Sequence, residues 1–206
     1  MLLKPSVQDI LDVAKTFNYP IYESKGIFNY NLNLWGIRST DKDTSTFNDT
    51  LCVLYQDVRG KWTIDYFLIT TDPSDLLLKN PENPKGTAIL CEGHHSKLWS
   101  YGFHKNRKDH KALVQYSPCR VYRDNDKDNI ADTDVITETG MFGINMHRAS
   151  AYTTNPLIGL YSAGCQVHYD VNRYNTIFIP LIENCIKEGN RIFSYSLCPQ
   201  KLFGNL

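Results

Sequence analysis

The chain lacks several features that would place it in a specialised class of protein. No apolar run approaches the roughly 18 residues that a membrane-spanning helix needs. Neither sign of charge is in excess, because 22 Lys and Arg balance 22 Asp and Glu over 206 residues. A basic face that would neutralise nucleic-acid phosphates is therefore not expected. The first residues, MLLKPSVQDILDV, interrupt their apolar run with Lys4, Pro5 and Asp9, which does not fit an export signal. We expect a globular protein that is cytoplasmic at synthesis, without a transmembrane segment or a nucleic-acid partner.

Cysteine is present, but without the spacing of a zinc site. The six cysteines contain no CxxC pair, and the six histidines do not complete a zinc-binding pattern with them. Without an export signal, reduced thiols are the default, and most of them should be small buried apolar residues. An exported chain would instead allow many disulfide pairings, among which the sequence does not choose. We therefore expect free thiols and no bound metal.

The hydrophobic pattern predicts an α+β fold that is mostly β. Helical spacing predicts a short amphipathic helix to about residue 17, with Ser6 as its cap and Asp9 in its first turn. A second helix is predicted over 170–188, where Pro180 either kinks it or lies in the first turn of its second half, and Gly189 ends it. Strands are predicted at 30–38, 51–58, 61–70, 87–91, 97–103, 111–116, 119–123, 140–147, 157–161 and 191–197, with a two-residue turn at Arg59-Gly60 and a loop at 72–86.

These elements predict one compact domain with a small appendage. Residues 1–27 form the predicted N-terminal helical appendage, and residues 28–206 form the main domain. We expect the strands to build a sheet or sandwich, with one helix after Cys165 and the short helix at the N-terminus.

An acidic cluster at 123–132 has two possible explanations. Asp124, Asp126, Asp128 and Asp132 occupy relative positions 1, 3, 5 and 9 of a calcium-binding loop. The sixth position is Asn where glycine is usual, and the twelfth is Val where a bidentate carboxylate is needed. These departures favour a solvated turn over a calcium site.

Two glycine-rich segments carry the residues with the clearest chemistry. Segment 140–148 (GMFGINMHR) contains His147, and segment 159–167 (GLYSAGCQV) contains Cys165. A cysteine nucleophile needs a base within hydrogen-bond reach and backbone N–H donors for the oxyanion. Gly164 suits this role, because glycine lets the backbone turn sharply and aim consecutive N–H groups at one point. The histidine precedes the cysteine by 165 − 147 = 18 residues, which fits neither papain-like nor caspase-like enzymes.

This arrangement resembles the L,D-transpeptidase (YkuD-like) family. The family signature is a histidine, a gap near this length, and then Ser/Thr-His-Gly-Cys-x-Arg/Asn. His147, Ser162, Gly164 and Cys165 match it, and the resemblance covers roughly residues 85–198.

Two positions of the motif depart from the family pattern. Ala163 stands where the family has a histidine, and Val167 stands where it has Arg or Asn. The form SAGCQV looks like a divergent branch associated with bacteriophage-type proteins, which would agree with the missing export signal.

The resemblance implies a role for each matching residue. Cys165 is expected to be the nucleophile and His147 the base that makes its thiolate, with the backbone carbonyl of Arg148 orienting the imidazole. The N–H groups of Gly164 and Cys165 are expected to form the oxyanion hole, supported by Ser162. The implied substrate is a peptidoglycan stem peptide, attacked at the diamino acid–D-alanine bond. The acyl-enzyme would then pass to an amine or to water, without a metal or organic cofactor.

The surroundings of this pair also have structural explanations. A free cysteine is more often a core residue than a nucleophile, and a histidine on an apolar strand is usually a hydrogen-bonded core residue. In a regular strand, however, Phe142, Ile144 and Met146 share one face, so that His147 and Asn145 point to the other. The alternation therefore favours a wet groove beside His147.

Three further residues are predicted to bind substrate. They are Asn145, His104 and His168, of which His168 lies three residues after Cys165 and is either a substitute anchor or a surface histidine. The pair His94-His95 either lines the same groove or belongs to an aromatic-rich core strand.

Two classes of function follow. The first is a cysteine enzyme that acts on peptidoglycan peptides, with hydrolysis of the cell wall during phage lysis or entry preferred to crosslinking. The second is a non-catalytic module on the same fold that binds cell wall or serves as a virion component, which Ala163 and Val167 favour. A metal hydrolase is disfavoured, because the histidines and aspartates lack ligand spacing.

Overall fold

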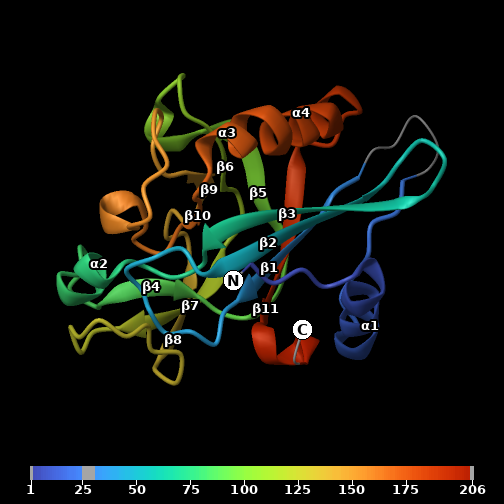
Figure 1. The fold of residues 1–206 in the computed structure, drawn as a ribbon. Helices are drawn as coiled ribbons and strands as arrows, with labels where there is room; N and C mark the ends of the chain where they lie inside the picture. The colour runs from blue at the N-terminus through green and yellow to red at the C-terminus, as the bar shows by residue number, and fades with distance from the viewer. Residues whose placement is uncertain (1, 25–30, 205–206) are drawn as a thin grey trace.

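The computed structural model describes residues 2–24 and 31–204, and most of its strands close into a barrel (Figure 1). The barrel order is β1-β11-β5-β6-β9-β10-β3-β2, and a separate sheet has the order β4-β7-β8. The barrel strands are β1 (Asn33–Arg38), β2 (Asp49–Gln56), β3 (Trp62–Thr70), β5 (Gly93–Phe103), β6 (Lys111–Gln115), β9 (Met146–Arg148), β10 (Gln166–His168) and β11 (Ile192–Pro199). The second sheet contains β4 (Thr87–Leu90), β7 (Cys119–Asp124) and β8 (Thr137–Gly140). The predicted strand-dominated α+β class is confirmed, with a closed barrel in place of a sandwich.

Helices are few and lie at the edges of the barrel. They are α1 (Val7–Phe17), α2 (Asp75–Lys79), α3 (Val171–Arg173) and α4 (Ile179–Lys187), and the π-helical turn η4 (Tyr174–Phe178) joins the last two. Three short 3₁₀ turns lie elsewhere: η2 (His104–Asn106) between β5 and β6, η3 (Gly159–Tyr161) between β9 and β10, and η5 (Gln200–Phe203) after β11. Within the described ranges, no helix is long and apolar enough to cross a membrane. The predicted boundary between residues 27 and 28 lies outside the described residues.

The N-terminal helix forms as its sequence predicts. The Ser6 side chain accepts a hydrogen bond from the N–H of Asp9, and the Asp9 carboxylate accepts one from the N–H of Ser6 at 2.7 Å. This reciprocal capping satisfies N–H groups that a helix start leaves free. Ile10, Val13 and Ala14 are buried in a cluster that also contains outward-facing side chains of β1 and β2. The helix therefore packs onto the outer face of the barrel.

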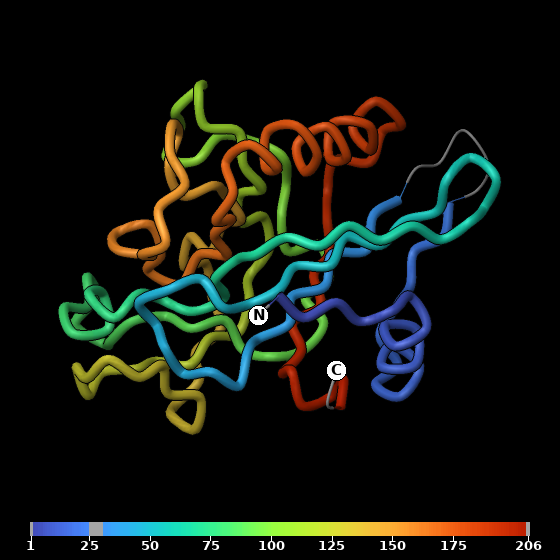
Figure 2. The backbone as a smooth tube through the Cα atoms, viewed as in Figure 1, coloured from blue at the N-terminus to red at the C-terminus, as the bar shows by residue number. Residues whose placement is uncertain are grey.

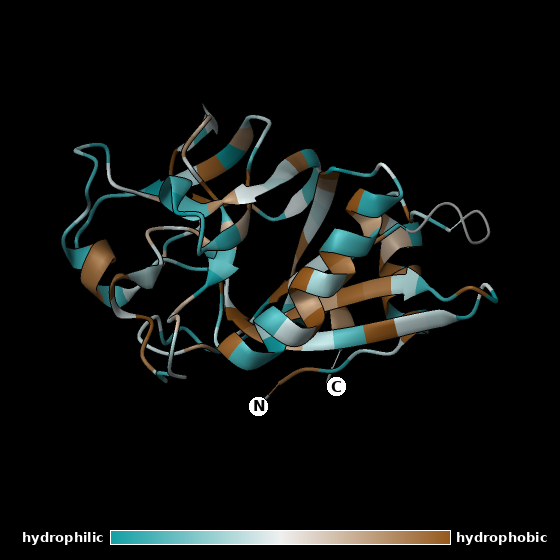
Figure 3. Cartoon of the chain, turned by 90° about the horizontal axis from the view of Figure 1, so that it is seen from above, coloured by the Kyte–Doolittle hydropathy of each residue, from teal (hydrophilic) through white to brown (hydrophobic). Residues whose placement is uncertain are grey.

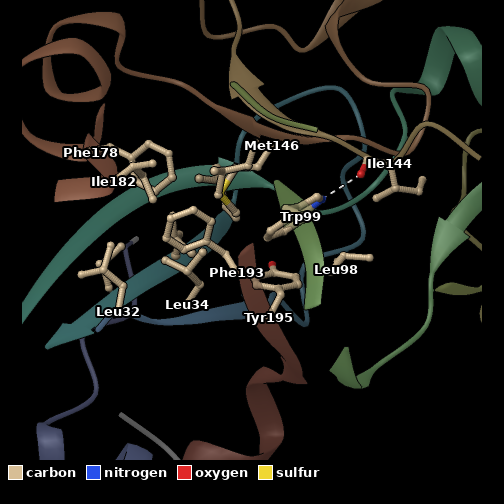
Figure 4. Close-up of a cluster of buried hydrophobic side chains, with 14 of the residues drawn as sticks. Leu32, Leu34, Leu98, Trp99, Ile144, Met146, Phe178, Ile182, Phe193 and Tyr195 are labelled. Atoms are coloured by element: carbon tan, nitrogen blue, oxygen red, sulfur yellow. Dashed lines mark hydrogen bonds between the residues drawn. The ribbon is translucent and has the colours of Figure 1, made fainter. Parts of the chain in front are cut away.

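The helical segment after residue 170 fills one side of the barrel core. Asp170 caps α3, a π-turn follows, and Pro180 lies in the first turn of α4. Seen from above, α4 crosses the strands with mixed brown and teal residues (Figure 3). Its apolar residues pack with Phe178 against barrel-lining side chains, as Figure 4 shows for Phe178 and Ile182. The predicted helix is confirmed, including its end at Gly189, which has φ +89°.

Four local predictions are wrong. The β2–β3 hairpin has a loop that Asp57 and Lys61 close through a 2.9 Å backbone hydrogen bond, not a two-residue turn. The predicted loop 72–86 contains α2, because Ser74 caps a helix there. The predicted strand 157–161 ends in the 3₁₀ turn η3. The predicted strand 140–147 is interrupted between β8 and β9, where Gly143 has φ +74°.

The parallel pairing of β9 with β10 positions the residues of interest. Met146 pairs with Gln166, and His147 pairs with Val167. Alternation puts the Met146 and His168 side chains toward the barrel core, where both are buried, and puts His147 and Val167 on the outer face. Cys165 shares the parity of Val167 and packs beside the same outer cluster. The cysteine and the histidine therefore leave this strand pair on the same side.

Candidate functional site

Cys165 is the one cysteine of the six that is not buried. The other five, all within the described residues, are free thiols enclosed by protein: Cys52, Cys91, Cys119, Cys185 and Cys198. Burial raises the pKa of each of them, for instance to about 12 at Cys119 and Cys185. Reactivity toward an external molecule is therefore confined to Cys165.

A sharp turn at Gly164 places this cysteine. Gly164 has φ +115°, and a Cβ built on it would lie 2.1 Å from the carbonyl oxygen of Ala88 in β4. Only glycine accommodates both the conformation and the close approach. The Ser162 hydroxyl lies 2.8 Å from the carbonyl of Cys165 and 2.9 Å from that of Asp72, and can donate to either. Ser162 is thus a buried clamp that holds the turn.

The hydrogen bonds of the turn change the expected oxyanion site. The N–H of Gly164 donates to the Ser162 oxygen at 3.3 Å, so it is engaged within the turn. Among the described residues, the N–H of Cys165 makes no hydrogen bond. The predicted oxyanion role of Gly164 is therefore not supported, and Cys165 supplies the backbone donor that is free.

The Cys165 sulfur lies against the segment before β9. Its thiol donates to the carbonyl of Gly143 at 3.5 Å, and the backbone N–H of Asn145 donates to the sulfur. Desolvation nevertheless dominates and raises the pKa of Cys165 to about 11. At neutral pH the sulfur is therefore a protonated thiol, so the thiolate that the resemblance implies is not its resting state.

His147 lies in β9 with only 2% of its surface exposed. Its Nδ1 lies 2.7 Å from the carbonyl oxygen of Arg148, which is the contact expected from the family resemblance. A carbonyl only accepts, so Nδ1 carries the proton and Nε2 of the neutral ring presents a lone pair. Nε2 is buried and has no hydrogen-bond partner. Burial holds the pKa of His147 well below its usual value, so the ring is neutral at pH 7.

The backbone register brings Cys165 and His147 onto neighbouring strand positions. The backbone N–H of Gln166 donates to the carbonyl oxygen of Asn145 at 2.8 Å, so Cys165 lies beside Asn145 in the strand pair. Asn145 is two residues before His147, and its side chain lies on the same face as that of His147. The Cα atoms of Cys165 and His147 are therefore expected roughly 8 Å apart, because neighbouring strands are ~4.8 Å apart and two residues along a strand span ~6.6 Å. The described residues contain no hydrogen bond between the two side chains. Such contacts often tighten only when substrate binds.

Two more histidines surround the base. The His104 ring stacks on His147 at 3.9 Å between centroids, and the His110 ring meets it edge-on at 5.3 Å. Desolvation lowers the pKa of both His104 and His110 to about 4. The Asn145 amide faces Nδ1 of His104 at 3.4 Å, while its oxygen accepts from the N–H of Gln115. No local sequence pattern marks His110 as a site residue, because its contact with His147 depends on the turn between β5 and β6.

The three histidines border a hollow of about 340 Å³, which we call the histidine-side hollow. The segment between β9 and β10 covers it from one side and the turn after β5 from the other, and Figure 2 shows these as the orange and green segments. Its lining comprises His104, Lys105, Arg107, His110, His147, Arg148, Ala149, Ser150, Ala151, Tyr152, Leu160 and Tyr161. The predicted groove beside His147 therefore exists, with His104 in its wall.

His168 is a core residue, and its predicted substrate-binding role is wrong. It is 1% exposed, and its ring packs against Phe67, Tyr174 and Phe178 at 4.4–5.3 Å between centroids. The offset of three residues from Cys165 is odd, so a strand turns the two side chains to opposite faces. Desolvation lowers the pKa of His168 to about 3.

The pair His94-His95 also lies away from the hollow. His94 Nδ1 is 2.9 Å from the Ser196 hydroxyl, and His95 Nε2 is 2.8 Å from the carbonyl of Cys91. Their neighbour Trp99 is fully buried and donates from its indole to the carbonyl of Ile144 (Figure 4). His94 and His95 are half-buried and neither lines the hollow, so the groove explanation is wrong for them, whereas Trp99 is a core residue.

The acidic loop keeps three aspartates together, of which Asp124 is buried, Asp132 half-buried and Asp126 exposed. Oxygen atoms of Asp124, Asp126 and Asp132 lie within 4.8 Å of one another, the one such group of potential metal ligands among the described residues. Asp124 also accepts from the N–H of Asp132 at 3.0 Å, which stabilises the turn. This bond is typical of a tight turn.

Comparison with known proteins adds no relative. No protein-family model matches the chain, and no curated protein or solved structure matches it significantly.

Proposed function

We propose that the protein is a cysteine enzyme that cleaves peptidoglycan stem peptides, on an L,D-transpeptidase-like domain of phage type. One observation carries the proposal. The single accessible cysteine shares a strand-pair face with a histidine whose Nδ1 is fixed by the Arg148 carbonyl and whose Nε2 is left without a partner. This is the tautomer that a general base needs.

The chemistry begins from a neutral thiol and a neutral imidazole. As the sulfur attacks the carbonyl carbon of the substrate, its proton passes to Nε2 of His147, and the N–H of Cys165 stabilises the developing oxyanion. The C–N bond then breaks, and the imidazolium returns the proton to the leaving amine. Water, deprotonated by the same ring, releases the acyl group and regenerates the thiol; an amine in place of water gives transfer.

The neutral resting pair is consistent with this sequence of steps. A raised pKa at Cys165 and a lowered one at His147 both oppose charge in the empty site. A bound carbonyl brings a group that takes up negative charge, so proton transfer is coupled to attack. Family features that support the same assignment are the turn at Gly164, the helix after the cysteine and the β-rich frame.

Purified peptidoglycan sacculi test the proposal. Wild-type protein should release new muropeptides, detected by liquid chromatography and mass spectrometry, and Cys165→Ala should release none. Cys198→Ala is the matched control, because it removes a buried thiol far from the turn and should retain activity. His147→Asn should lower the rate by about 10²–10⁴, the usual contribution of a general base.

The non-catalytic module is the second candidate, and specific positions favour it. Val167 is fully buried and Ala163 has no polar group, so neither supplies the substrate anchor that the family places there. Co-sedimentation with sacculi in the absence of any product would support this candidate and exclude cleavage.

A further inference from the structure

Gln166 directly follows Cys165, and its side chain points into the barrel. It shares the strand parity of His168, a core residue, whereas Cys165 shares that of Val167 on the outer face. Gln166 is fully buried. The family signature leaves this position unspecified, so the resemblance assigns Gln166 no role. A buried primary amide needs hydrogen-bond partners for both its oxygen and its nitrogen, and here these partners lead to the turn that carries the cysteine.

The hydrogen bonds of this amide fix its orientation. Its Nε2 lies 3.3 Å from the carbonyl oxygen of Thr71 and 3.4 Å from that of Gly164, and it donates one hydrogen to each. The amide oxygen would find no donor at either carbonyl, so the nitrogen must point this way. Oε1 therefore faces the hydroxyl of Tyr195, which donates to it at 2.8 Å.

The bond to Gly164 acts on the peptide unit that precedes the nucleophile. A peptide unit is planar and trans, so its carbonyl and its N–H point in opposite directions. The carbonyl of Gly164 and the N–H of Cys165 belong to one such unit, and the Gln166 amide holds the carbonyl toward the barrel interior. The N–H, which makes no hydrogen bond among the described residues, is thereby directed away from the interior. This N–H is the donor that the proposed reaction uses for the oxyanion.

The other partner of the amide nitrogen is firmly held. The N–H and the hydroxyl of Thr71 donate to the Asp49 carboxylate at 2.6 and 2.8 Å. The Ser162 hydroxyl lies 2.9 Å from the carbonyl of Asp72, the next residue along. The side chains that stand three residues before and one residue after the cysteine thus contact adjacent carbonyls of one fixed segment.

Tyr195 reaches Gln166 across the barrel. It lies in β11, which is four strands from β10 in either direction around the closed barrel, so the hydrogen bond spans the interior. A Cβ on Gly36 of β1 would overlap the Tyr195 hydroxyl, so only glycine leaves room for this group. Burial holds the pKa of Tyr195 well above its ordinary value, so the hydroxyl stays protonated and donates. Its ring packs on Trp99 at 4.6 Å between centroids, a contact that does not need the hydroxyl (Figure 4).

We infer that Gln166 and Tyr195 are positioning residues, which together fix the peptide unit between residues 164 and 165 so that the N–H of Cys165 faces the oxyanion of a bound substrate. This inference rests on the proposed cleavage reaction. Both side chains are fully buried, so they act through the backbone and not by touching the substrate. A donor on the Gly164 carbonyl also polarises the amide, which makes the N–H of Cys165 a stronger donor.

Tyr195→Phe tests this pair with the smallest change. It removes the hydroxyl that orients the Gln166 amide and keeps the ring in contact with Trp99. Tyr174→Phe is the matched control, because Tyr174 is also fully buried and its hydroxyl also donates one 2.8 Å hydrogen bond, to the carbonyl of Lys111 and not to the turn. The two variants should lose similar unfolding free energy in urea.

Kinetics with soluble muropeptides separate positioning from loss of stability. Tyr195→Phe should lower kcat about tenfold, a part of the 10²–10³ that removal of an oxyanion donor costs. It should leave KM within about twofold, because a misdirected oxyanion donor is felt in the transition state and not in the bound substrate. Tyr174→Phe should keep both constants within about twofold of the wild type.

Gln166→Leu provides a double-mutant cycle. It removes all the hydrogen bonds of the amide, so it should lower kcat at least as much as Tyr195→Phe. The double variant should be no slower than Gln166→Leu alone, because Tyr195 acts only through the amide.

Alkylation of Cys165 reports on the turn without substrate. A loosened turn lets water reach the sulfur, which lowers the pKa of the thiol toward its ordinary value. Tyr195→Phe should therefore react with iodoacetamide at pH 7 about threefold faster than the wild type, the effect of half a pKa unit on the thiolate fraction. Tyr174→Phe should react at the wild-type rate, and each variant should take one label because the other five cysteines stay enclosed.

Two results would overturn the inference. They are equal kcat values in Tyr195→Phe and Tyr174→Phe, and additive losses in the double variant. A wild-type protein that releases no product refutes the cleavage reaction instead. In that case faster alkylation of Tyr195→Phe alone still supports the hold of this pair on the turn, and equal alkylation of the two tyrosine variants refutes it.

Discussion

Replacing Gly164 by alanine is the sharpest test of how the backbone places Cys165. The added Cβ would lie 2.1 Å from the Ala88 carbonyl oxygen and 3.0 Å from Cδ1 of Ile144. Ala88 is held in β4 by its pairing with Arg123 in β7. The carbonyl must therefore move by about 1 Å against the second sheet, or the turn must open.

The expected cost has two parts. Overpacking against a constrained group costs about 1–3 kcal/mol, and an alanine at φ +115° adds about 1–3 kcal/mol of backbone strain. We expect Gly164→Ala to lose about 3 kcal/mol of unfolding free energy. Gly143→Ala is the matched control, because Gly143 also has positive φ but has nothing within 4 Å of its Cβ position. It should lose about 1 kcal/mol.

Urea unfolding followed by tryptophan fluorescence measures both variants against the wild type. The turn also positions the sulfur, so Gly164→Ala should lose cleavage of sacculi even where it remains folded. Equal unfolding midpoints for the two alanine variants, with equal m-values, would show that the contact with Ala88 does not constrain the turn.

Two further predictions concern titration. Cys165 should be alkylated slowly by iodoacetamide at pH 7, because its pKa of about 11 keeps the thiol protonated. The alkylation rate should rise about tenfold per pH unit up to about pH 10, and intact-mass spectra should show one label per folded chain. A rate constant that is unchanged between pH 7 and 9 would contradict this prediction. His168 has a pKa of about 3 when folded, below its ordinary 6.5, so the unfolded chain binds the proton first and stability falls as the pH drops below about 6.5. Between pH 7.5 and 5, His168 should lower the free energy of unfolding by about 2 kcal/mol. In His168→Leu the change in unfolding free energy over this pH range should be smaller by that amount. An unchanged pH dependence of the urea midpoint in this variant would refute the prediction.

The sequence predicts local structure where one residue type meets one physical requirement. Ser6 and Asp9 mark a helix start because only such side chains satisfy its free N–H groups, and Gly164 marks a sharp turn because of its φ. The pattern also places His147 on the face opposite Met146. These inferences need no knowledge of the rest of the fold.

What the sequence does not contain is the arrangement of distant strands. Whether the sheet closes depends on β1 pairing with β11, across most of the chain. The contact of His110 with His147 depends on two strands being neighbours, and no local pattern indicates it. The error at His168 has another cause: closeness to Cys165 in sequence does not put the two side chains on one face, because an odd offset along a strand turns them to opposite faces.

Parallel neighbours cannot be joined by a tight hairpin, so the chain needs a long return path between β9 and β10. That path, residues 149–165, supplies Ser150, Tyr152 and Tyr161 to the wall of the histidine-side hollow. Residues 150–157 of this path, all within the described part of the chain, make no hydrogen bond to β9 or β10, whereas Ser162 and Gly164 hold the turn before Cys165. The β9–β10 pairing therefore fixes where His147 and Cys165 lie, whereas the connecting segment determines the shape of the wall above His147.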